Sequence, residues 1–183
     1  MHGSLLIRSA QARDVDAIVQ LVESSYRGDQ SRRGWTTEAD LLSGQRTDRG
    51  EVDAALKNTP GRSSTMLLGE LDGELVGCLQ LTRAGDTLAP SPQVGLGMFA
   101  IRPARQGIGL GKQLLIAAEA AARMRGAKQL RIEVIGQRQE LIGWYQRRGF
   151  VPSGERAPFP YGQPRFGLPL RSNLYFCIMI KQL

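Results

Sequence analysis

The sequence predicts a mixed α/β fold, with helices packed on a sheet that contains hairpins and one parallel crossover. Two strand-like runs meet at Asp72-Gly73, the strongest short hairpin signal. Over residues 94–134, a strand-like run, a long amphipathic helix and a second strand-like run follow one another. Because hairpins pair antiparallel and a strand–helix–strand unit pairs parallel, the sheet is expected to be mixed.

The apolar pattern places the elements in order along the chain. The first helix is expected to open at Asp14, because Asp can accept hydrogen bonds from the free amides of a first turn. A further helix start is expected at 36–40, where hydroxyls precede acids. Gly126 and Gly149 are expected to end two later helices. The expected strands cover 5–8, 65–71, 74–81, 94–101, 130–134, a start at 150–151, and 174–180, and the main helices cover 14–26, 109–125 and 140–147.

Composition limits the class of protein. The chain has 183 residues, 42% hydrophobic and 22% charged, as is typical of one globular domain, expected over 1–183. It shows no apolar run near the roughly 20 residues that span a bilayer and no apolar signal-peptide core at its N-terminus. Cys78 and Cys177 lie in apolar stretches, which favours core packing in a reducing cytosol. We therefore expect a cytoplasmic protein with no membrane partner.

Charge and histidine content favour some classes of partner and exclude some kinds of site. Lys and Arg number 24 and Asp and Glu 17, a net charge of +7, so a polyanionic partner is favoured. The arginines are scattered rather than gathered in a block, which favours a phosphate-bearing small molecule over nucleic acid. His2 is the only histidine, at the chain end, so a histidine-based metal site or catalytic triad is excluded and no metal is expected. Segments rich in Pro and Gly, at 85–92 and 152–172, are expected to form loops.

The most informative motif is the glycine-rich run 105–112, between an expected strand and helix. Glycines let the backbone approach a bulky anion, and a helix N-terminus adds free amides and partial positive charge. A P-loop would need Gly where Gln106 stands, and a dinucleotide fingerprint would need Gly where Lys112 stands. The run fits Gln-x-x-Gly-x-Gly instead, through Gln106, Gly109 and Gly111. It predicts a phosphate cradle.

Several motifs in fixed order resemble one family. The run Gly97-Met98-Phe99-Ala100-Ile101-Arg102-Pro103, followed by this loop, resembles the coenzyme A-binding core of the Gcn5-related N-acetyltransferases. Ile132-Glu133-Val134 and the run Trp144 to Phe150 are similar to that family's later strand, Tyr-bearing helix and Gly-Phe step. The resemblance covers about 94–151 in detail, and the element order fits along the whole chain.

The resemblance implies a fold and a cosubstrate. The fold is a strongly twisted mixed sheet of about seven strands flanked by about four helices, splayed between the fourth and fifth strands, with acetyl-CoA in the opening. Backbone groups of one strand would pair the pantetheine arm, and the glycine loop would hold the pyrophosphate. The implied cofactor-binding residues are Phe99, Ala100, Ile101, Arg105, Gln106, Gly107, Ile108, Gly109, Leu110, Gly111 and Lys112.

The resemblance also implies direct acetyl transfer to a primary amine of a small molecule, amino acid or peptide N-terminus. Tyr145 occupies the family's general-acid position. Glu133, twelve residues earlier, occupies the position of a base in some members, and a water chain is the alternative. Gly95 stands where other members carry a base, and Arg138 where the family often has Asn, which leaves the holding of pantetheine or phosphate open.

The acceptor is less constrained. The segment after the first helix and the late loops usually shape it, which here points to Tyr26, Arg27 and Trp35. Arginines and aromatics there suit an amine that also carries a carboxylate or phosphate, or they only anchor loops. The other residues in these segments are Arg32, Arg33, Phe159, Tyr161 and Arg165.

The sequence leaves two further functional hypotheses open. A toxin-like member would acetylate aminoacyl-tRNA, and a non-catalytic module would only sense coenzyme A. Members of the family are often dimers, so a homodimer is also open.

Overall fold

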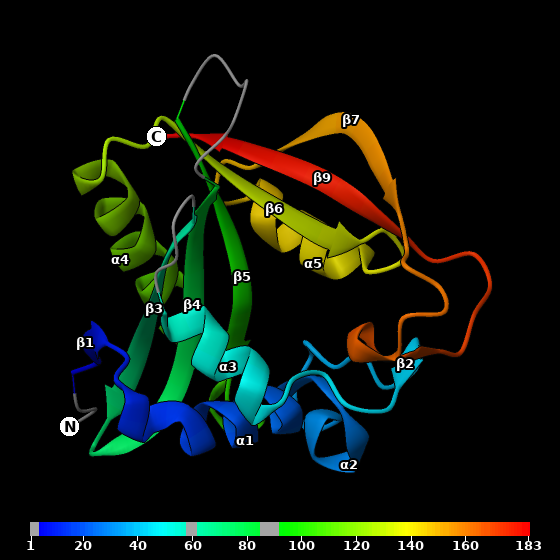
Figure 1. The fold of residues 1–183 in the computed structure, drawn as a ribbon, viewed down its shortest axis with the longest axis horizontal. Coiled ribbons are helices and arrows are strands. Elements are labelled where there is room, and N and C mark those ends of the chain that lie inside the picture. Colours follow the sequence, from blue (N-terminus) through cyan, green and yellow to red (C-terminus); the bar gives the residue numbers. More distant parts are fainter. Residues whose placement is uncertain (1–3, 58–61, 85–91) are drawn as a thin grey trace.

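The computed structural model describes residues 4–57, 62–84 and 92–183. Its main feature is a seven-stranded sheet in the order β1-β3-β4-β5-β6-β9-β7 (Figure 1). A separate two-stranded sheet pairs β2 with β8. His2 and most of the loop expected at 85–92 lie outside the described residues. The strands are β1 (Leu6–Ser9), β2 (Leu42–Ser43), β3 (Arg62–Leu71), β4 (Glu74–Ala84), β5 (Gln93–Ile101), β6 (Gln129–Ile135), β7 (Val151–Pro158), β8 (Leu168–Pro169) and β9 (Tyr175–Gln182).

Helices cover both faces of this sheet (Figure 1). On one face, α4 and α5 pack with a core that includes Leu114, Leu115 and Phe150. On the other face, α1 and α3 pack with a core that includes Ile18, Val52 and Leu68. The helices are α1 (Val15–Tyr26), α2 (Gly28–Ser31), α3 (Arg49–Leu56), α4 (Leu110–Met124) and α5 (Gln139–Gln146).

The pairing pattern confirms the expected mixed sheet. Asp72 and Gly73, with φ of 52° and 79°, form the predicted turn between β3 and β4. Strands β5 and β6 pair in parallel, and their last pair is Gly95 with Arg131. Beyond that pair the two strands separate, so the sheet is splayed where the resemblance placed the opening (Figure 1).

A β-bulge in β5 decides which side chains face this opening. Gln80 pairs with Gly97 and Cys78 with Ala100, so two residues of β5 lie opposite one residue of β4. One of the two is Met98, with φ of +40°. The extra residue inverts the alternation of the strand.

The inversion is visible in the two cores. Val94 and Leu96 pack on the α4 side, whereas Met98 packs on the α1 side. Phe99 and Ile101 are thereby turned toward α4 and the opening. Without the bulge they would point toward α1.

Helix α1 begins directly after Asp14, as expected, but the expected capping bond and a second expected helix start were wrong. The Asp14 carboxylate accepts from the Gln11 amide and pairs with Arg8, and it makes no capping bond to α1. No helix begins at 36–40, because Glu38 is held by Arg27 and Thr37 by Ser31. A helix forms later, at α3, where Asp48 caps the Glu51 amide.

The segment expected as a loop at 152–172 is partly sheet. It contains most of β7, which pairs with β9 around a register shift between Pro152 and Arg156, and also β8. That shift tolerates the Pro and Gly residues that weaken a strand signal.

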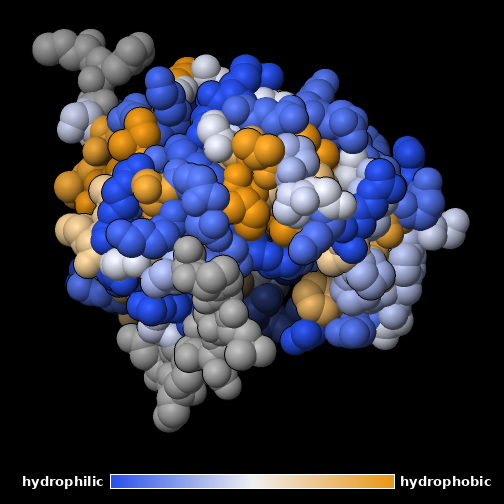
Figure 2. All heavy atoms as spheres, turned by 90° about the horizontal axis from the view of Figure 1, so that it is seen from above, coloured by the Kyte–Doolittle hydropathy of each residue, from blue (hydrophilic) through white to orange (hydrophobic). Residues whose placement is uncertain are grey.

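One face of the molecule carries its hydrophobic residues in small groups. Figure 2 shows a mainly hydrophilic face with a few hydrophobic patches. In the described residues, no helix is long and apolar enough to cross a membrane.

Candidate functional site

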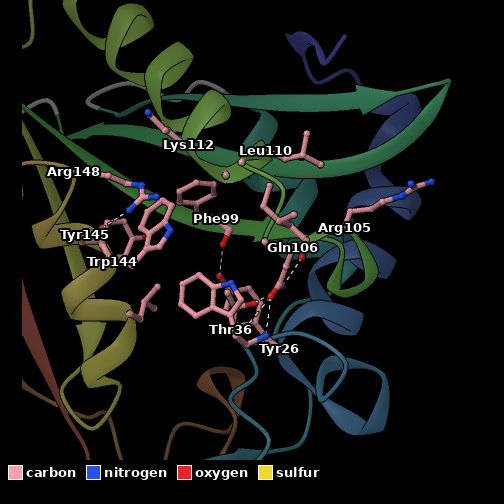
Figure 3. A pocket seen from close by; sticks show the side chains of 16 residues that line it. Tyr26, Thr36, Phe99, Arg105, Gln106, Leu110, Lys112, Trp144, Tyr145 and Arg148 are labelled. Carbon is pink, nitrogen blue, oxygen red and sulfur yellow. Dashed lines mark hydrogen bonds between the residues drawn. The ribbon is translucent and has the colours of Figure 1, made fainter. Parts of the chain in front are cut away.

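A cavity of about 290 Å³ lies between the glycine-rich loop and α5 (Figure 3). We call it the glycine-loop cavity. Besides the loop and the first turn of α4, side chains from β5, α5 and the segment after α2 line it. Those used below are Trp35, Thr36, Phe99, Gln106, Lys112, Leu141, Trp144, Tyr145 and Arg148.

The loop presents backbone donors to this cavity. Gly107 and Gly109 have φ of +84° and +90°, a conformation that costs little only for glycine. Helix α4 starts at Leu110, so the amides of its first turn have no acceptor within the helix. Helix N-termini of this kind hold phosphate well.

Cationic side chains add to these donors. Lys112 is exposed at the cavity, and none of the described residues pairs with its ammonium group. The Arg148 guanidinium carbon lies 3.5 Å from the centre of the Trp144 ring, and burial lowers the pKa of Arg148. Arg105 is less free, because Glu74 lies 3.1 Å from its guanidinium.

Aromatic rings form the apolar wall of the cavity. Trp144 packs edge-on against Phe99 at 5.9 Å and lies 6.3 Å from Trp35. A Cβ on Gly111 would lie 3.5 Å from the Trp144 ring, so the helix approaches the ring closely. An apolar chain fits this wall, and phosphates fit the loop.

Gln106 joins the loop to the segment after α2. Its side chain donates to the Ile101 carbonyl at 2.9 Å and to the Thr36 hydroxyl at 2.7 Å, and accepts from the Trp35 amide at 2.9 Å (Figure 3). A Cβ on Gly34 would lie 2.6 Å from the Gln106 Oε1 atom, so glycine at 34 permits this contact. Gln106 therefore acts through its side chain as a clamp that places Trp35.

A second cavity, of about 130 Å³, adjoins the first. We call it the arginine cavity, because Arg27, Arg46 and Arg138 line it. Four residues line both cavities, and the two spaces therefore share a wall. They are Tyr26, Phe99, Leu141 and Tyr145.

Tyr145 stands in this shared wall. It comes from α5, which buries Ile142 and Tyr145 on one side. Its ring packs edge-on against Trp144 at 5.0 Å and Phe150 at 5.3 Å. Burial raises its pKa well above 10, so the phenol keeps its proton at neutral pH.

Tyr26, in the same wall, supports the β-bulge. Its hydroxyl donates to the Phe99 carbonyl, and the Cys78 thiol donates to the Met98 carbonyl at 3.2 Å. Burial raises the pKa of Tyr26 to about 12 and of Cys78 to about 12, so both remain donors. These bonds hold the bulge carbonyls on the α1 side.

Glu133 lines the arginine cavity, but its carboxylate already has a partner. The Arg131 Nη1 atom lies 2.5 Å from Glu133 Oε1, and both side chains are partly exposed. The pair is therefore weak in water.

The other predicted site residues fall into two groups: those that line one of the two cavities and those that do not. The predicted loop residues line the glycine-loop cavity except Ile108, which is exposed, and the Ala100 side chain is buried toward α1. Phe159 joins Arg27 at the arginine cavity. Four acceptor candidates line neither cavity: Arg32, Arg33, Tyr161 and Arg165.

Sequence reasoning missed several lining residues. Arg46 and Glu38 carry no motif, and they reach the arginine cavity only through the path of the chain after α2. Trp144 and Arg148 could have been found, because they are neighbours of Tyr145 on α5. Among the described residues, no group of His, Cys, Asp and Glu could hold a metal ion.

Comparison with known proteins agrees with this geometry. Residues 17–150 match the Acetyltransferase (GNAT) family. A search of curated proteins finds no significant match.

Three solved structures share the fold over nearly the full chain. The GNAT-family acetyltransferase of Streptococcus pneumoniae is 21% identical, with 98% of this chain and 100% of that chain covered and a TM-score of 0.65. PaiA N-acetyltransferase from Thermoplasma acidophilum, solved with coenzyme A, is 17% identical, with 98% and 99% covered and a TM-score of 0.65. Salmonella typhimurium yncA, solved with its cofactor acetyl-CoA, is 21% identical, with 98% and 94% covered and a TM-score of 0.68.

Proposed function

The chain belongs to the Acetyltransferase (GNAT) family, and we propose that it forms a single domain that transfers the acetyl group of acetyl-CoA to a primary amine. The acceptor class is a small molecule, an amino acid or a peptide N-terminus. The observation that carries this proposal is the shared wall of the two cavities, in which Tyr145 stands.

The glycine-loop cavity fits acetyl-CoA in chemistry. The free amides at the start of α4, with Lys112 and Arg148, suit the phosphates. The aromatic wall of Phe99 and Trp144 suits the pantetheine arm. Backbone groups of Phe99 to Ile101 lie past the last β5–β6 pair, so β6 does not pair with them, while the Phe99 and Ile101 carbonyls accept from Tyr26 and Gln106.

The reaction needs one carbon–nitrogen bond formed and one carbon–sulfur bond broken. The neutral amine attacks the thioester carbonyl and loses one proton, and the departing thiolate gains one. An amine has a pKa near ~10, so a base is useful at neutral pH. Glu133, or water beside it, takes that proton from the arginine-cavity side. The protonated Tyr145 phenol donates toward the thiolate.

The test is release of free thiol from acetyl-CoA in the presence of amine panels. Tyr145→Phe keeps the ring packing and removes only the hydroxyl, so kcat is expected to fall by about 100-fold or more. Acetyl-CoA affinity, measured by calorimetry, should stay within about twofold.

Tyr175→Phe is the matched control, since Tyr175 lies on β9 outside both cavities. Unchanged turnover in Tyr145→Phe would refute the acid role. Binding of acetyl-CoA without thiol release for any amine would favour a sensor. Tight, salt-dependent tRNA binding would favour the toxin-like reading.

A further inference from the structure

The arginine cavity holds more positive than negative charge. Arg27 lies 2.6 Å from Glu38, and these two charges balance. Glu133 is balanced by Arg131. Arg138 and Arg46 remain as an excess of two positive charges beside the cavity.

The guanidinium groups of these two arginines have few bonds. Arg138 is 8% exposed, and its one side-chain contact is 3.4 Å long, to the Glu38 carboxylate that Arg27 already binds. Arg46 stacks over the Tyr26 ring at 5.5 Å, and no described residue accepts a hydrogen bond from its guanidinium. Glu23, on α1, accepts from the backbone amides of Arg46 and Thr47 and does not line the cavity.

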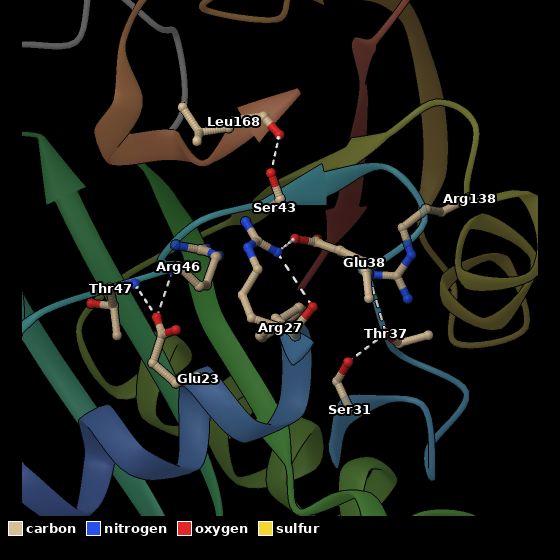
Figure 4. Close-up of polar contacts among 12 residues, drawn as sticks. Glu23, Arg27, Ser31, Thr37, Glu38, Ser43, Arg46, Thr47, Arg138 and Leu168 are labelled. Atoms are coloured by element: carbon tan, nitrogen blue, oxygen red, sulfur yellow. Dashed lines mark hydrogen bonds and ion pairs between the residues drawn. The ribbon is translucent and has the colours of Figure 1, made fainter. Parts of the chain in front are cut away.

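Arg46 and Arg138 both line the cavity, and both carry N–H groups without a hydrogen-bond partner among the described residues. Arg27 differs, because its Nε and Nη2 atoms are unpartnered and sealed from solvent. The unpartnered nitrogens of the other two arginines are not sealed in this way, and both residues line the cavity. Figure 4 shows Arg27, Glu38, Arg46 and Arg138 together, although they come from three segments of the chain.

Such an arrangement is stabilised by an anion. A buried charge without a partner costs free energy, and a carboxylate that accepts two or more N–H bonds offsets that cost. Guanidinium groups recognise carboxylates through paired hydrogen bonds. The cavity therefore has the donors for one carboxylate.

The rest of the lining is apolar. Phe159 lies 5.6 Å from Phe176, and Leu42, Ile135 and Phe166 complete this side. The volume of about 130 Å³ equals that of about four water molecules in the liquid. A small acceptor with an apolar side chain fits this space.

We propose that the arginine cavity binds the carboxylate of an apolar α-amino acid through Arg46 and Arg138, and presents its amine at the Tyr145 wall. This inference rests on the proposed acetyl transfer. The amine and carboxylate of an α-amino acid are separated by one carbon, so the anion binds near the shared wall.

The test compares matched acceptors in the thiol-release assay. L-alanine, L-valine, L-leucine and L-phenylalanine are each compared with the corresponding α-amide, which keeps the amine and removes the charge. The amino acid is expected to exceed its amide in kcat/KM by at least about 10-fold, because bonds between charged groups are the stronger ones.

The variant Arg46→Met removes the charge and keeps the length of the side chain. We expect KM for the preferred amino acid to rise at least about 10-fold, while KM for its amide and the affinity for acetyl-CoA stay within about twofold. Arg125→Met is the matched control, since Arg125 is exposed at the end of α4. Retained acetyl-CoA affinity also reports that the variant is folded.

The outcomes separate this inference from the proposed function. Amides acetylated as well as or better than amino acids would overturn the carboxylate site and leave acetyl transfer standing. Acetyl-CoA binding with no amino acid acetylated would also overturn the carboxylate site. Failure to bind acetyl-CoA at all would overturn the proposed function itself.

Discussion

The two cavities of this protein are adjacent but are built in different ways. Most of the glycine-loop cavity comes from β5, the following loop and α4, which are continuous in the chain, and α5 closes it. The arginine cavity is assembled from the end of α1, the segment 38–46, β5, β6, the start of α5 and residues near 159–176. Backbone amides and glycines supply the phosphate-binding end of the first cavity, whereas the charged groups of the second cavity all come from side chains.

This difference indicates which of the two cavities can change its lining residues without loss of the fold. Backbone donors at a helix N-terminus recognise phosphates whatever the neighbouring side chains are, so the first cavity suits a constant cosubstrate. Side chains on irregular segments can be replaced without loss of the sheet, so the second cavity suits a variable acceptor. Gln106 is the link, since it ties the segment at Trp35 to the loop.

The largest effect on the glycine-loop cavity alone is expected for the variant Gly109→Glu. It places a carboxylate and a Cβ at a residue with φ of +90° in the loop. Strain costs about 1–2 kcal/mol, and the negative charge opposes phosphate, so acetyl-CoA affinity should fall at least about 10-fold by calorimetry.

Gly126→Glu is the matched control for that variant. Gly126 has φ of +77°, has open space around its Cα and follows the far end of α4. It should lose similar stability and keep its affinity for acetyl-CoA. Equal losses of affinity in the two variants would mean that strain, and not the phosphate cradle, explains the effect.

A smaller effect is expected for Gln106→Ala. It removes the clamp, which is worth about one net hydrogen bond or roughly 1 kcal/mol, and so about fivefold in affinity. Acetyl-CoA affinity and the KM of the amine should both weaken, because Trp35 and the loop loosen together. Gln113→Ala, an exposed position one turn into α4, is the control. An effect confined to acetyl-CoA would show that Gln106 serves the loop alone.

Much of the fold could be predicted because its signals are local. The Asp72-Gly73 turn, the helix ended by Gly126 and the glycine loop each depend on neighbouring residues. The capping bond of Asp14 and the helix start at 36–40 were wrongly predicted, because Arg8 pairs with Asp14 and Arg27 pairs with Glu38. Tertiary partners overrode a local preference in both places.

The candidate site likewise has residues that local motifs predict and residues that only tertiary contacts place. Tyr145 and the glycine loop follow from a motif, and their placement at one cavity could be anticipated. The bulge at Met98 could not, because nothing in an apolar run marks the extra residue that turns Phe99 toward the opening. Arg46 could not be anticipated either, since its approach to Tyr26 depends on an irregular segment.

The most direct test of the proposed acetyl-CoA site is tryptophan fluorescence during titration with acetyl-CoA. The chain has two tryptophans, Trp35 and Trp144, and both line the glycine-loop cavity. If acetyl-CoA binds in this cavity, emission is expected to change saturably with one site per chain. Emission that stays unchanged up to millimolar acetyl-CoA would contradict the proposed site, because both rings line the cavity that acetyl-CoA is proposed to fill.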